Sequence, residues 1–558
     1  MPIVGLMLEA GSQTDAIERL LKAYNITPLL PAENQKGELR IAELEKADLI
    51  LVDKQLHRIF GDDSGRKMAE HLHAEKKPVV LMVSSVPNDE KDFDLLREGA
   101  IDGFINRSLA VSEWPPCLAA FRPGDQFPNC AAQIRLLRID GYEVAHVWEE
   151  IGKAFGKAED LAVCEECCVL FRKLVAPCAT AVTLRQIHSG QSGQSGAKVL
   201  RAEVSFGDGP MSEDLSVKYG KRDKIRREAM HYDRYVGPLP DGVAAQLRWR
   251  SETDNYGALA YSWVGDSVED GVPLGPVTDR SPALDWLRRQ ATIDRLFRVS
   301  LSSWYEVFRR GKGSSMCTLH DLYVSDVGVF REIAEFGAGE AAPRVDISES
   351  YVDIHDPKVW AFALENGKTR PNAVTWAKEG FASRITPPRL APSHGDLHVK
   401  NVYVLPDNSP RLIDFGDTGV HHLFRDFAAL EVSVRLTCVK DKDLAALSAM
   451  EKRVNNSKDL CSSIPLDGLG GSHDLREALR TTEIIRKAAQ EACGYHGEAR
   501  GNLLEYLYAV VAHLLRYASG RADELGEEQH ERESVRVWHA MYAAALATEN
   551  AIELERMI

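Results

Sequence analysis

The sequence predicts a chain of two parts: a parallel α/β domain at the N-terminus, then an α+β part whose second half is mostly helical. Short apolar strands alternate with amphipathic helices over residues 1–121. A β-rich segment with a Gly/Ser turn follows residue 179, and beyond residue 430 apolar residues recur at helical spacing. With 558 residues, 44% hydrophobic and 27% charged, the chain is long enough for several globular domains.

The overall charge and the lack of long apolar runs exclude several classes of protein. A formal net charge of −15 argues against a polyanion-binding surface, so we expect no nucleic-acid partner. No apolar run approaches the ~20 residues of a membrane helix, and the N-terminus has an early Glu and no basic segment. The ten Cys lack the spacing of a small disulfide-bonded domain. We therefore expect a cytoplasmic protein without a membrane partner.

Five strands are predicted in the N-terminal domain, namely IVGLMLE, ITPLLP, DLILVD, PVVLMVSS and DGFINR. Helical segments such as TDAIERLLKAY and SGRKMAEHLHAE lie between them, which predicts a doubly wound, flavodoxin-like sheet. Ligand chemistry in such sheets lies at the carboxyl ends of the strands, where this chain has Glu9, Asp53, Ser84 and Asn106.

The segment LILVDKQL resembles the strand of response-regulator receiver domains that ends in the phosphorylated Asp, which implies Asp53 as a possible phosphoacceptor. Ser84 in MVSS stands where that family has Ser or Thr. The chain departs from the family at Asn106, which replaces the usual Lys, and in having Glu9 alone where the family has an acidic pair. A neutral amide supplies no cation to stabilise an acyl phosphate. Two alternatives remain: an active receiver-like domain, and a receiver fold that serves to dock a signalling partner or a second copy.

Residues 122–178 are expected to form a linker and helices. RPGDQFPN has the composition of a turn-rich linker, and LAVCEECCVLFRKLV has the spacing of an amphipathic helix. Zinc would require four converging ligands, so Cys164, Cys167 and Cys168 are expected to be buried structural thiols on the apolar face of that helix.

A strand–turn–strand pattern follows, with Gly190, Gly193 and Gly196 in the turn. Glycines allow the backbone to approach phosphate groups closely, although a plain flexible hairpin has the same pattern. Further on, EDLSVKYGKRDKIRREAM places Lys218 at the end of a short strand and Glu228 on the next helix. A strand Lys held by a helix carboxylate orients nucleotide phosphates in kinases, and a surface charge pair is the alternative.

The segment SHGDLHVKNVYVLPDNSPRLIDFGDTG carries the densest group of polar residues. NVYVL and RLIDF alternate and flank the turn PDNSP, so we predict a β-hairpin. Asp396 and Asn401 then lie at or before the start of its first strand, and Asp414 lies near the end of its second. Such oxygen ligands at one edge could hold a hard cation.

This order of Gly-rich turn, Lys, Glu, HGDLHVKN and IDFGD resembles the aminoglycoside phosphotransferase and choline kinase group of the protein-kinase-like fold. The resemblance covers about residues 179–540 and implies a two-lobed domain, with an N-lobe over 179–270 and a helical C-lobe over 271–558. It implies a kinase that transfers the γ-phosphate of ATP to a hydroxyl group with the help of Mg²⁺.

Residue by residue, the resemblance implies Asp396 as the catalytic base and His394 as the residue that shapes its loop. It implies Asn401 and Asp414 as Mg²⁺ ligands, and Asp426 as a structural Asp. It also implies an ATP site formed by Lys218, Glu228, Gly190, Gly193 and Gly196.

The acceptor is an unknown hydroxyl-bearing small molecule or protein, and the receiver-like domain is a candidate regulator. Two alternatives stay open. The same fold could transfer a nucleotidyl group from ATP bound in reverse, or the chain could be a signalling module that senses ATP without turnover.

Overall fold

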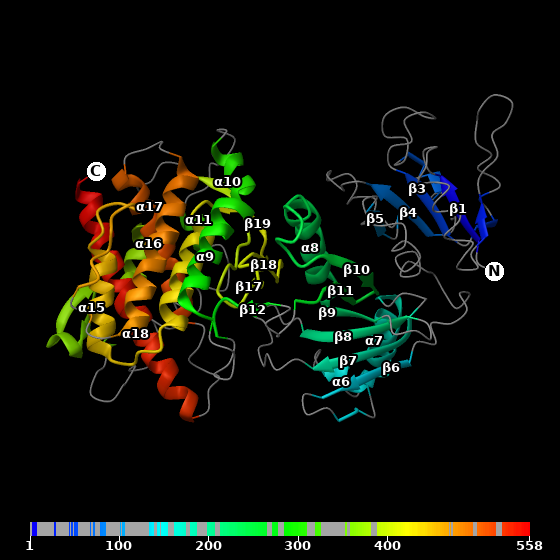
Figure 1. The fold of residues 1–558 in the computed structure, drawn as a ribbon, viewed down its shortest axis with the longest axis horizontal. Helices are drawn as coiled ribbons and strands as arrows, with labels where there is room; N and C mark the ends of the chain where they lie inside the picture. Colours follow the sequence, from blue (N-terminus) through cyan, green and yellow to red (C-terminus); the bar gives the residue numbers. More distant parts are fainter. Residues whose placement is uncertain are drawn as a thin grey trace. The chain divides into compact units, whose positions relative to one another are not determined.

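The structure is a computed structural model, and it forms two compact units (Figure 1). The first unit comprises residues 1–238 and 245–263, and the second comprises residues 239–244 and 264–558. The structure describes residues 3–7, 27–29, 44, 46–47, 49–53, 67–68, 71–72, 79–84, 101, 103–106, 133–138, 142–144, 147–153, 161–174, 179–186, 198–206, 212–264, 271–276, 284–309, 319–324, 352–353, 356, 358–380, 388–467, 469, 472–494, 499–519 and 527–557.

All five strands predicted for the N-terminal domain are present, each shorter than its apolar run. They are β1 (Ile3–Met7), β2 (Thr27–Leu29), β3 (Leu49–Asp53), β4 (Val79–Ser84) and β5 (Gly103–Asn106). They form a parallel sheet in the order β2-β1-β3-β4-β5, one of the two common orders of doubly wound sheets. β3 is buried along its whole length, as a central parallel strand requires.

A six-stranded sheet of order β10-β11-β9-β8-β7-β6 follows in the chain (Figure 1). Its strands are β6 (Gln133–Leu137), β7 (Ala179–Gln186), β8 (Lys198–Phe206), β9 (Ser212–Lys221), β10 (Leu247–Glu252) and β11 (Tyr256–Ser262). The neighbours pair antiparallel except β6 and β7, which pair parallel. β7 and β8 are the predicted strand–turn–strand pair. β6 was not predicted, because its partner β7 lies far from it in the sequence.

Two helices cover this sheet. α7 (Leu161–Leu174) packs on β10 and β11, where the Ser251 hydroxyl donates to the Leu170 carbonyl at 2.9 Å. Its thiols at Cys164 and Cys167 are buried, as predicted, and form no disulfide, while the side chain of Cys168 lies outside the described part of the chain. α8 (Arg222–His231) packs on β11 and β9. The approach of α8 to β11 requires Gly257, since a Cβ at that residue would lie 2.8 Å from Ile225.

The second unit is mostly helical, as the spacing of apolar residues predicted. Its main helices are α9 (Trp286–Arg295), α10 (Ser302–Arg309), α11 (Leu319–Val324), α13 (Ala373–Gly380), α14 (Arg425–Ser433), α15 (Leu444–Asn455), α16 (His473–Cys493), α17 (Ala499–Ser519) and α18 (Glu527–Met557). α17 and α18 contact each other extensively, and the apolar stripe of α17, including Leu503, Leu507 and Leu514, is buried. In the part of the chain that the structure describes, no helix has the length and hydropathy to cross a membrane.

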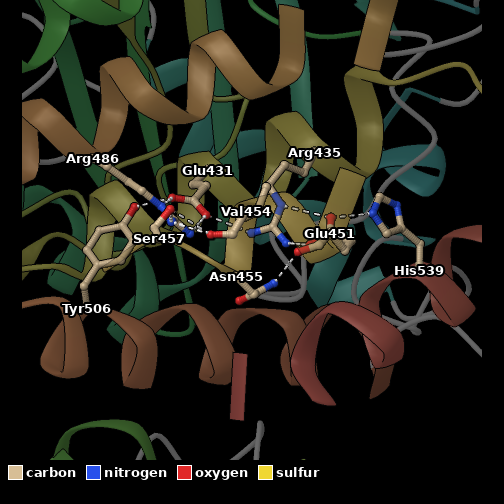
Figure 2. Close-up of polar contacts among 9 residues, drawn as sticks. All are labelled: Glu431, Arg435, Glu451, Val454, Asn455, Ser457, Arg486, Tyr506 and His539. Carbon is tan, nitrogen blue, oxygen red and sulfur yellow. Dashed lines mark hydrogen bonds and ion pairs between the residues drawn. The ribbon is translucent and has the colours of Figure 1, made fainter. Parts of the chain in front are cut away.

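A network of buried polar and charged side chains joins α14, α15, α16, α17 and α18 (Figure 2). The Glu431 carboxylate accepts from Arg435 at 2.8 Å, from Arg486 at 2.9 and 3.0 Å, and from the Tyr506 hydroxyl at 2.7 Å. Arg435 also pairs with Glu451, which lies 2.7 Å from His539. The charges are two carboxylates and two guanidinium groups, each at most 2% exposed. We call Glu431, Arg435, Glu451 and Arg486 the buried quartet.

Short strands in the second unit carry the predicted polar hairpin. β17 (Val402–Val404) and β18 (Pro410–Leu412) pair antiparallel, with β12 (Val272–Pro273) beside β17. The Leu412 N–H also donates to the Val243 carbonyl at 2.7 Å. β16 (Leu390–Ser393) pairs antiparallel with β19 (Gly419–His422), so the loops that follow β16 and β18 belong to one compact group of strands.

Candidate active site

The loop between β16 and β17, residues 394–401, turns sharply at Gly395. Its φ of +83° lies in the left-handed region, and a Cβ there would stand 2.0 Å from the Asp417 carbonyl oxygen. No other residue fits this position without moving the backbone. We call residues 394–401 the HGD loop.

The N-terminal turn of α14 holds the HGD loop through its backbone. The Asp426 carboxylate, which is fully buried, accepts from the N–H groups of His394 at 2.7 Å and Gly395 at 3.0 Å. The Arg425 side chain donates to the Gly395 carbonyl at 2.7 Å. Burial raises the pKa of Asp426, while His394, these N–H groups and Arg425 oppose that rise. Asp426 thus contacts the loop backbone, which is the geometry of a structural residue.

His394 connects the HGD loop to the strand that precedes Asp414. Its Nε2–H donates to the Ile413 carbonyl at 2.9 Å, and its ring lies 5.6 Å from that of Phe415. The side chain is fully buried. This geometry gives His394 the role of shaping the loop rather than touching a reactant.

Asp396 follows Gly395 and exposes about a third of its side chain. One carboxylate oxygen lies 3.5 Å from Arg516 of α17, and the other lies 3.6 Å from His398. Burial alone would raise the pKa of Asp396, but His398, Arg516, His394 and Arg425 outweigh it and lower the pKa to about 2. At neutral pH the group is therefore an anion that can accept a hydrogen bond.

Asn401 ends the HGD loop and is joined to Asp396. Its Nδ2 donates to the Asp396 carbonyl at 2.9 Å, and its own carbonyl accepts from the Ile413 N–H at 3.1 Å. Asp414 lies after β18, at the other side of the hairpin from Asn401 in sequence. Its side chain is exposed, and its φ is +63°. Asp is one of the few side chains that tolerate this conformation, and such outliers gather at functional sites. The structure thus places both predicted metal ligands at the end of the β17–β18 hairpin, which is the end that the HGD loop joins.

Lys218 and Glu228 form the predicted pair in the first unit. The Lys218 Nζ lies 2.7 Å from the Glu228 carboxylate, and their side chains are only 8% and 4% exposed. The Tyr261 hydroxyl donates to the other Glu228 oxygen at 3.0 Å. Lys218 lies within β9 rather than at its end. The pair is therefore buried, whereas the alternative prediction was a charge pair on the surface.

Comparisons with known proteins give partial matches. Residues 361–518, which include the HGD loop, match the family model described as "Ternary complex associated domain 9". No curated protein matches the chain in sequence.

Among solved structures, the chain is similar to the macrolide 2'-phosphotransferase of Brachybacterium faecium, with 15% identity and a TM-score of 0.32, over 64% of this chain and 91% of that one. It is also similar to the choline kinase of Streptococcus pneumoniae, with 10% identity and a TM-score of 0.31, over 64% and 92%. It is similar as well to the ethanolamine kinase of Plasmodium vivax, with 8% identity and a TM-score of 0.32, over 64% of this chain and 81% of that one. At such identities and TM-scores, similarity establishes no activity for the chain.

Some predicted site residues lie outside the described residues, namely Gly190, Gly193, Gly196 and Glu9. Asp53 ends β3 and is 3% exposed. Ser84 and Asn106 end the two following strands of the sheet and are register partners. The three are therefore at one edge of the sheet, as the topology predicted.

Sequence reasoning missed the cations around Asp396. Arg425 precedes Asp426 in LFRDF, and Arg516 is a single charge in the apolar helix HLLRYA. Neither belongs to a recognisable motif, and Arg516 is far from the HGD loop in sequence, so only the fold reveals the contact. His421 and His422 are both engaged: His421 bonds to the Asp417 carbonyl, and His422 lies between Tyr323 and Glu505, at 2.8 Å from each.

Proposed function

We propose that the chain is an ATP- and Mg²⁺-dependent phosphotransferase that transfers the γ-phosphate to a hydroxyl group of a small-molecule or protein acceptor. The HGD loop carries the proposal. Its left-handed Gly395, the clamp from Asp426 and the bond between Asn401 and Asp396 hold the Asp396 carboxylate and the Asn401 amide beside the end of the hairpin, where Asp414 follows β18. Phosphoryl transfer requires positioning and charge neutralisation more than covalent chemistry, and these groups suit that need.

In this proposal Asp396 accepts a hydrogen bond from the acceptor hydroxyl and orients its oxygen for attack. Because the pKa of Asp396 is about 2, the carboxylate is a weak base, and it takes the proton only as the bond to phosphorus forms. Lys218, held by Glu228, binds phosphate oxygens of the nucleotide. The proposal assigns Gly190, Gly193 and Gly196 to the phosphate-covering turn.

The donor set at the hairpin suits Mg²⁺. Asn401 uses its amide nitrogen on Asp396, which leaves its amide oxygen as a ligand, and Asp414 adds a carboxylate. Within the described residues, no three His, Cys, Asp or Glu side chains form a metal-binding group. Mg²⁺ typically binds one or two protein oxygens together with substrate phosphates, so this sparse set fits. The bound ion would neutralise phosphate charge.

Identifying the nucleotide product tests the proposal. Purified protein with Mg²⁺ and ATP labelled in the adenine ring should release ADP. Transfer of labelled AMP to an acceptor, with release of pyrophosphate measured in a separate assay, would indicate nucleotidyl transfer. Asp414→Asn should weaken ATP binding in the presence of Mg²⁺ and leave Mg²⁺-free binding unchanged. Equal affinities in all four conditions would contradict the metal assignment.

The family description favours a second candidate, a module that binds ATP without turnover and takes part in a complex. In such a module, the N-terminal sheet would dock the partner. In an active enzyme, the same sheet would instead act as a receiver-like domain that regulates turnover. ATP binding without release of any labelled product would support this candidate.

A further inference from the structure

We propose that Arg516 is a positioning residue that holds the Asp396 carboxylate in its working orientation, an inference that rests on the proposed phosphotransferase activity. Arg516 lies in the last turn of α17, and its guanidinium group is 3.5 Å from Asp396 Oδ1. His398 lies 3.6 Å from Oδ2. The two carboxylate oxygens thus face two different cationic or ionisable groups, which favours one orientation of the carboxylate.

The two contacts differ in what they can fix. His398 belongs to the HGD loop, two residues after Asp396, so it moves with the loop and cannot set the loop's orientation relative to the helices. Arg516 comes from another element. In the described part of the chain, it is the ion-pair partner of Asp396 from outside the HGD loop. Its side chain is 21% exposed, so solvent screens this pair less than a fully exposed one.

The helix that carries Arg516 is firmly attached to the strands beside the HGD loop. Glu505 of α17 accepts from Arg389, which precedes β16, at 2.9 Å, and from His422, the last residue of β19, at 2.8 Å. His422 in turn bonds to the Tyr323 hydroxyl. α17 therefore spans the same pair of strands that leads into the HGD loop.

A second attachment joins α17 to the helix that clamps the loop. The Tyr506 hydroxyl of α17 donates to Glu431 at 2.7 Å, at one end of the buried quartet (Figure 2). Glu431 belongs to α14, whose Asp426 holds the HGD loop backbone and whose Ser433 hydroxyl accepts from the Val399 N–H at 3.1 Å. The backbone of the loop and the cation beside its carboxylate thus belong to one connected set of hydrogen bonds and ion pairs.

The experiment measures ADP release from Mg²⁺-ATP, with pools of hydroxyl-bearing small molecules and proteins as acceptors, for wild type, Arg516→Ala, Arg516→Lys, Asp396→Ala and the double variant Asp396→Ala/Arg516→Ala. Misplacing a reacting group by about 1 Å can cost about 10²-fold. We expect Arg516→Ala to lower kcat by about tenfold or more, with the KM for ATP and the melting temperature nearly unchanged. Lysine should recover part of the loss, since it keeps the charge without the planar fork.

The double variant tests whether Arg516 acts through Asp396. If it does, adding Arg516→Ala to Asp396→Ala should cause no further loss. Arg500→Ala is the matched control, because it removes the same side chain from an exposed position at the other end of α17, and it should leave kcat unchanged.

The outcomes separate the two proposals. Loss of activity in Asp396→Ala with wild-type kcat in Arg516→Ala overturns the positioning role and leaves the phosphotransferase standing. A further loss in the double variant, or a loss that follows the melting temperature, also overturns it. If wild type releases no ADP, or Asp396→Ala releases as much as wild type, the proposed function fails and the inference fails with it.

Discussion

At the residue scale, the chemistry expected of the chain depends on a carboxylate whose surroundings favour orientation over basicity. A general base works best when its pKa is near the working pH, whereas that of Asp396 is about 2. Cations close to Asp396 keep it ionised, and an ionised carboxylate is a good hydrogen-bond acceptor for a hydroxyl. We therefore expect Asp396 to contribute mainly by orienting the acceptor hydroxyl, and to take its proton only as the bond to phosphorus forms.

Asp396→Ala should leave folding and ATP binding nearly intact and remove transfer. General-base and orienting groups contribute typically 10²–10⁴-fold, so ADP release should fall by at least about 10²-fold. The measurements are the melting temperature, ATP affinity and ADP release. Wild-type ADP release in this variant would rule out the assigned role of Asp396.

Lys218→Ala should act differently, through poorer phosphate binding. We expect a lower turnover together with a loss of ATP affinity larger than that of Asp396→Ala. Because Glu228 would remain buried without its cation, the melting temperature should also fall. Lys218→Ala/Glu228→Gln is the control, and it should recover stability without recovering ATP affinity. An unchanged affinity in Lys218→Ala would contradict the nucleotide role.

At the element scale, the candidate site depends on a turn that tolerates glycine alone. Gly395→Ala should cost about 1–2 kcal/mol of unfolding free energy for the left-handed backbone, and more for the contact with the Asp417 carbonyl. Turnover should fall as well, because relieving the contact displaces Asp396. Gly367→Ala is a matched control, since Gly367 has a φ of +72° but nothing within 4 Å of its Cβ position.

Urea unfolding and ADP release measure both variants. Gly367→Ala should lose the unfolding free energy that a left-handed backbone costs an alanine, and it should keep full turnover. If the two variants lose equal stability and both keep full turnover, the tight contact at Gly395 does not control the HGD loop.

The sequence was sufficient for elements whose pattern is local. The hairpin around PDNSP, the five apolar strands of the first domain and the helices after residue 430 follow from alternation, turn residues and helical spacing. The short β6 was missed because its pairing with β7 depends on partners that are distant in sequence. For the same reason the sequence indicated Asp396 and Asn401 but not Arg516, whose contact with the HGD loop exists only in the packed helices.

At the scale of the whole molecule, buried carboxylates link stability to pH. Burial alone would raise the pKa of Glu451, but Arg435 and His539 lower it to about 2, and His422 and Arg389 likewise lower that of Glu505 to about 2. The ordinary value is 4.5, so the folded state holds the charged form more strongly than the unfolded state does.

The stability that these two groups supply is therefore fully present above about pH 5 and is lost as the pH falls from about 4.5 to about 2. Urea unfolding followed by far-UV circular dichroism at pH 7, 5, 4 and 3 should show a steep decline below pH 5. Glu505→Gln should be less stable at pH 7 and show a shallower decline. A free energy of unfolding that stays constant down to pH 3 would contradict the depressed pKa values.

The N-terminal sheet allows a separate test of phosphorylation. Asp53 is buried at the end of β3, and Asn106 ends β5 where a receiver would have Lys. Acetyl phosphate should therefore label Asp53 poorly, as judged by mass spectrometry, and leave ADP release unchanged. Asn106→Lys should increase the labelling, and Asp53→Asn is the background control. Stoichiometric labelling of wild type with a change in turnover would show that the sheet is an active phosphoacceptor domain.

The buried quartet also limits how this sequence can diverge. Loss of one partner leaves an uncompensated charge in the interior and costs about 3–5 kcal/mol, a large share of the ~5–15 kcal/mol that keeps a protein folded. If single substitutions replaced the quartet with apolar residues one at a time, the proteins at the intermediate stages would thus fold poorly. Glu431, Arg435, Glu451 and Arg486 should therefore be inherited together or replaced together, and partly altered sets should be rare in descendants.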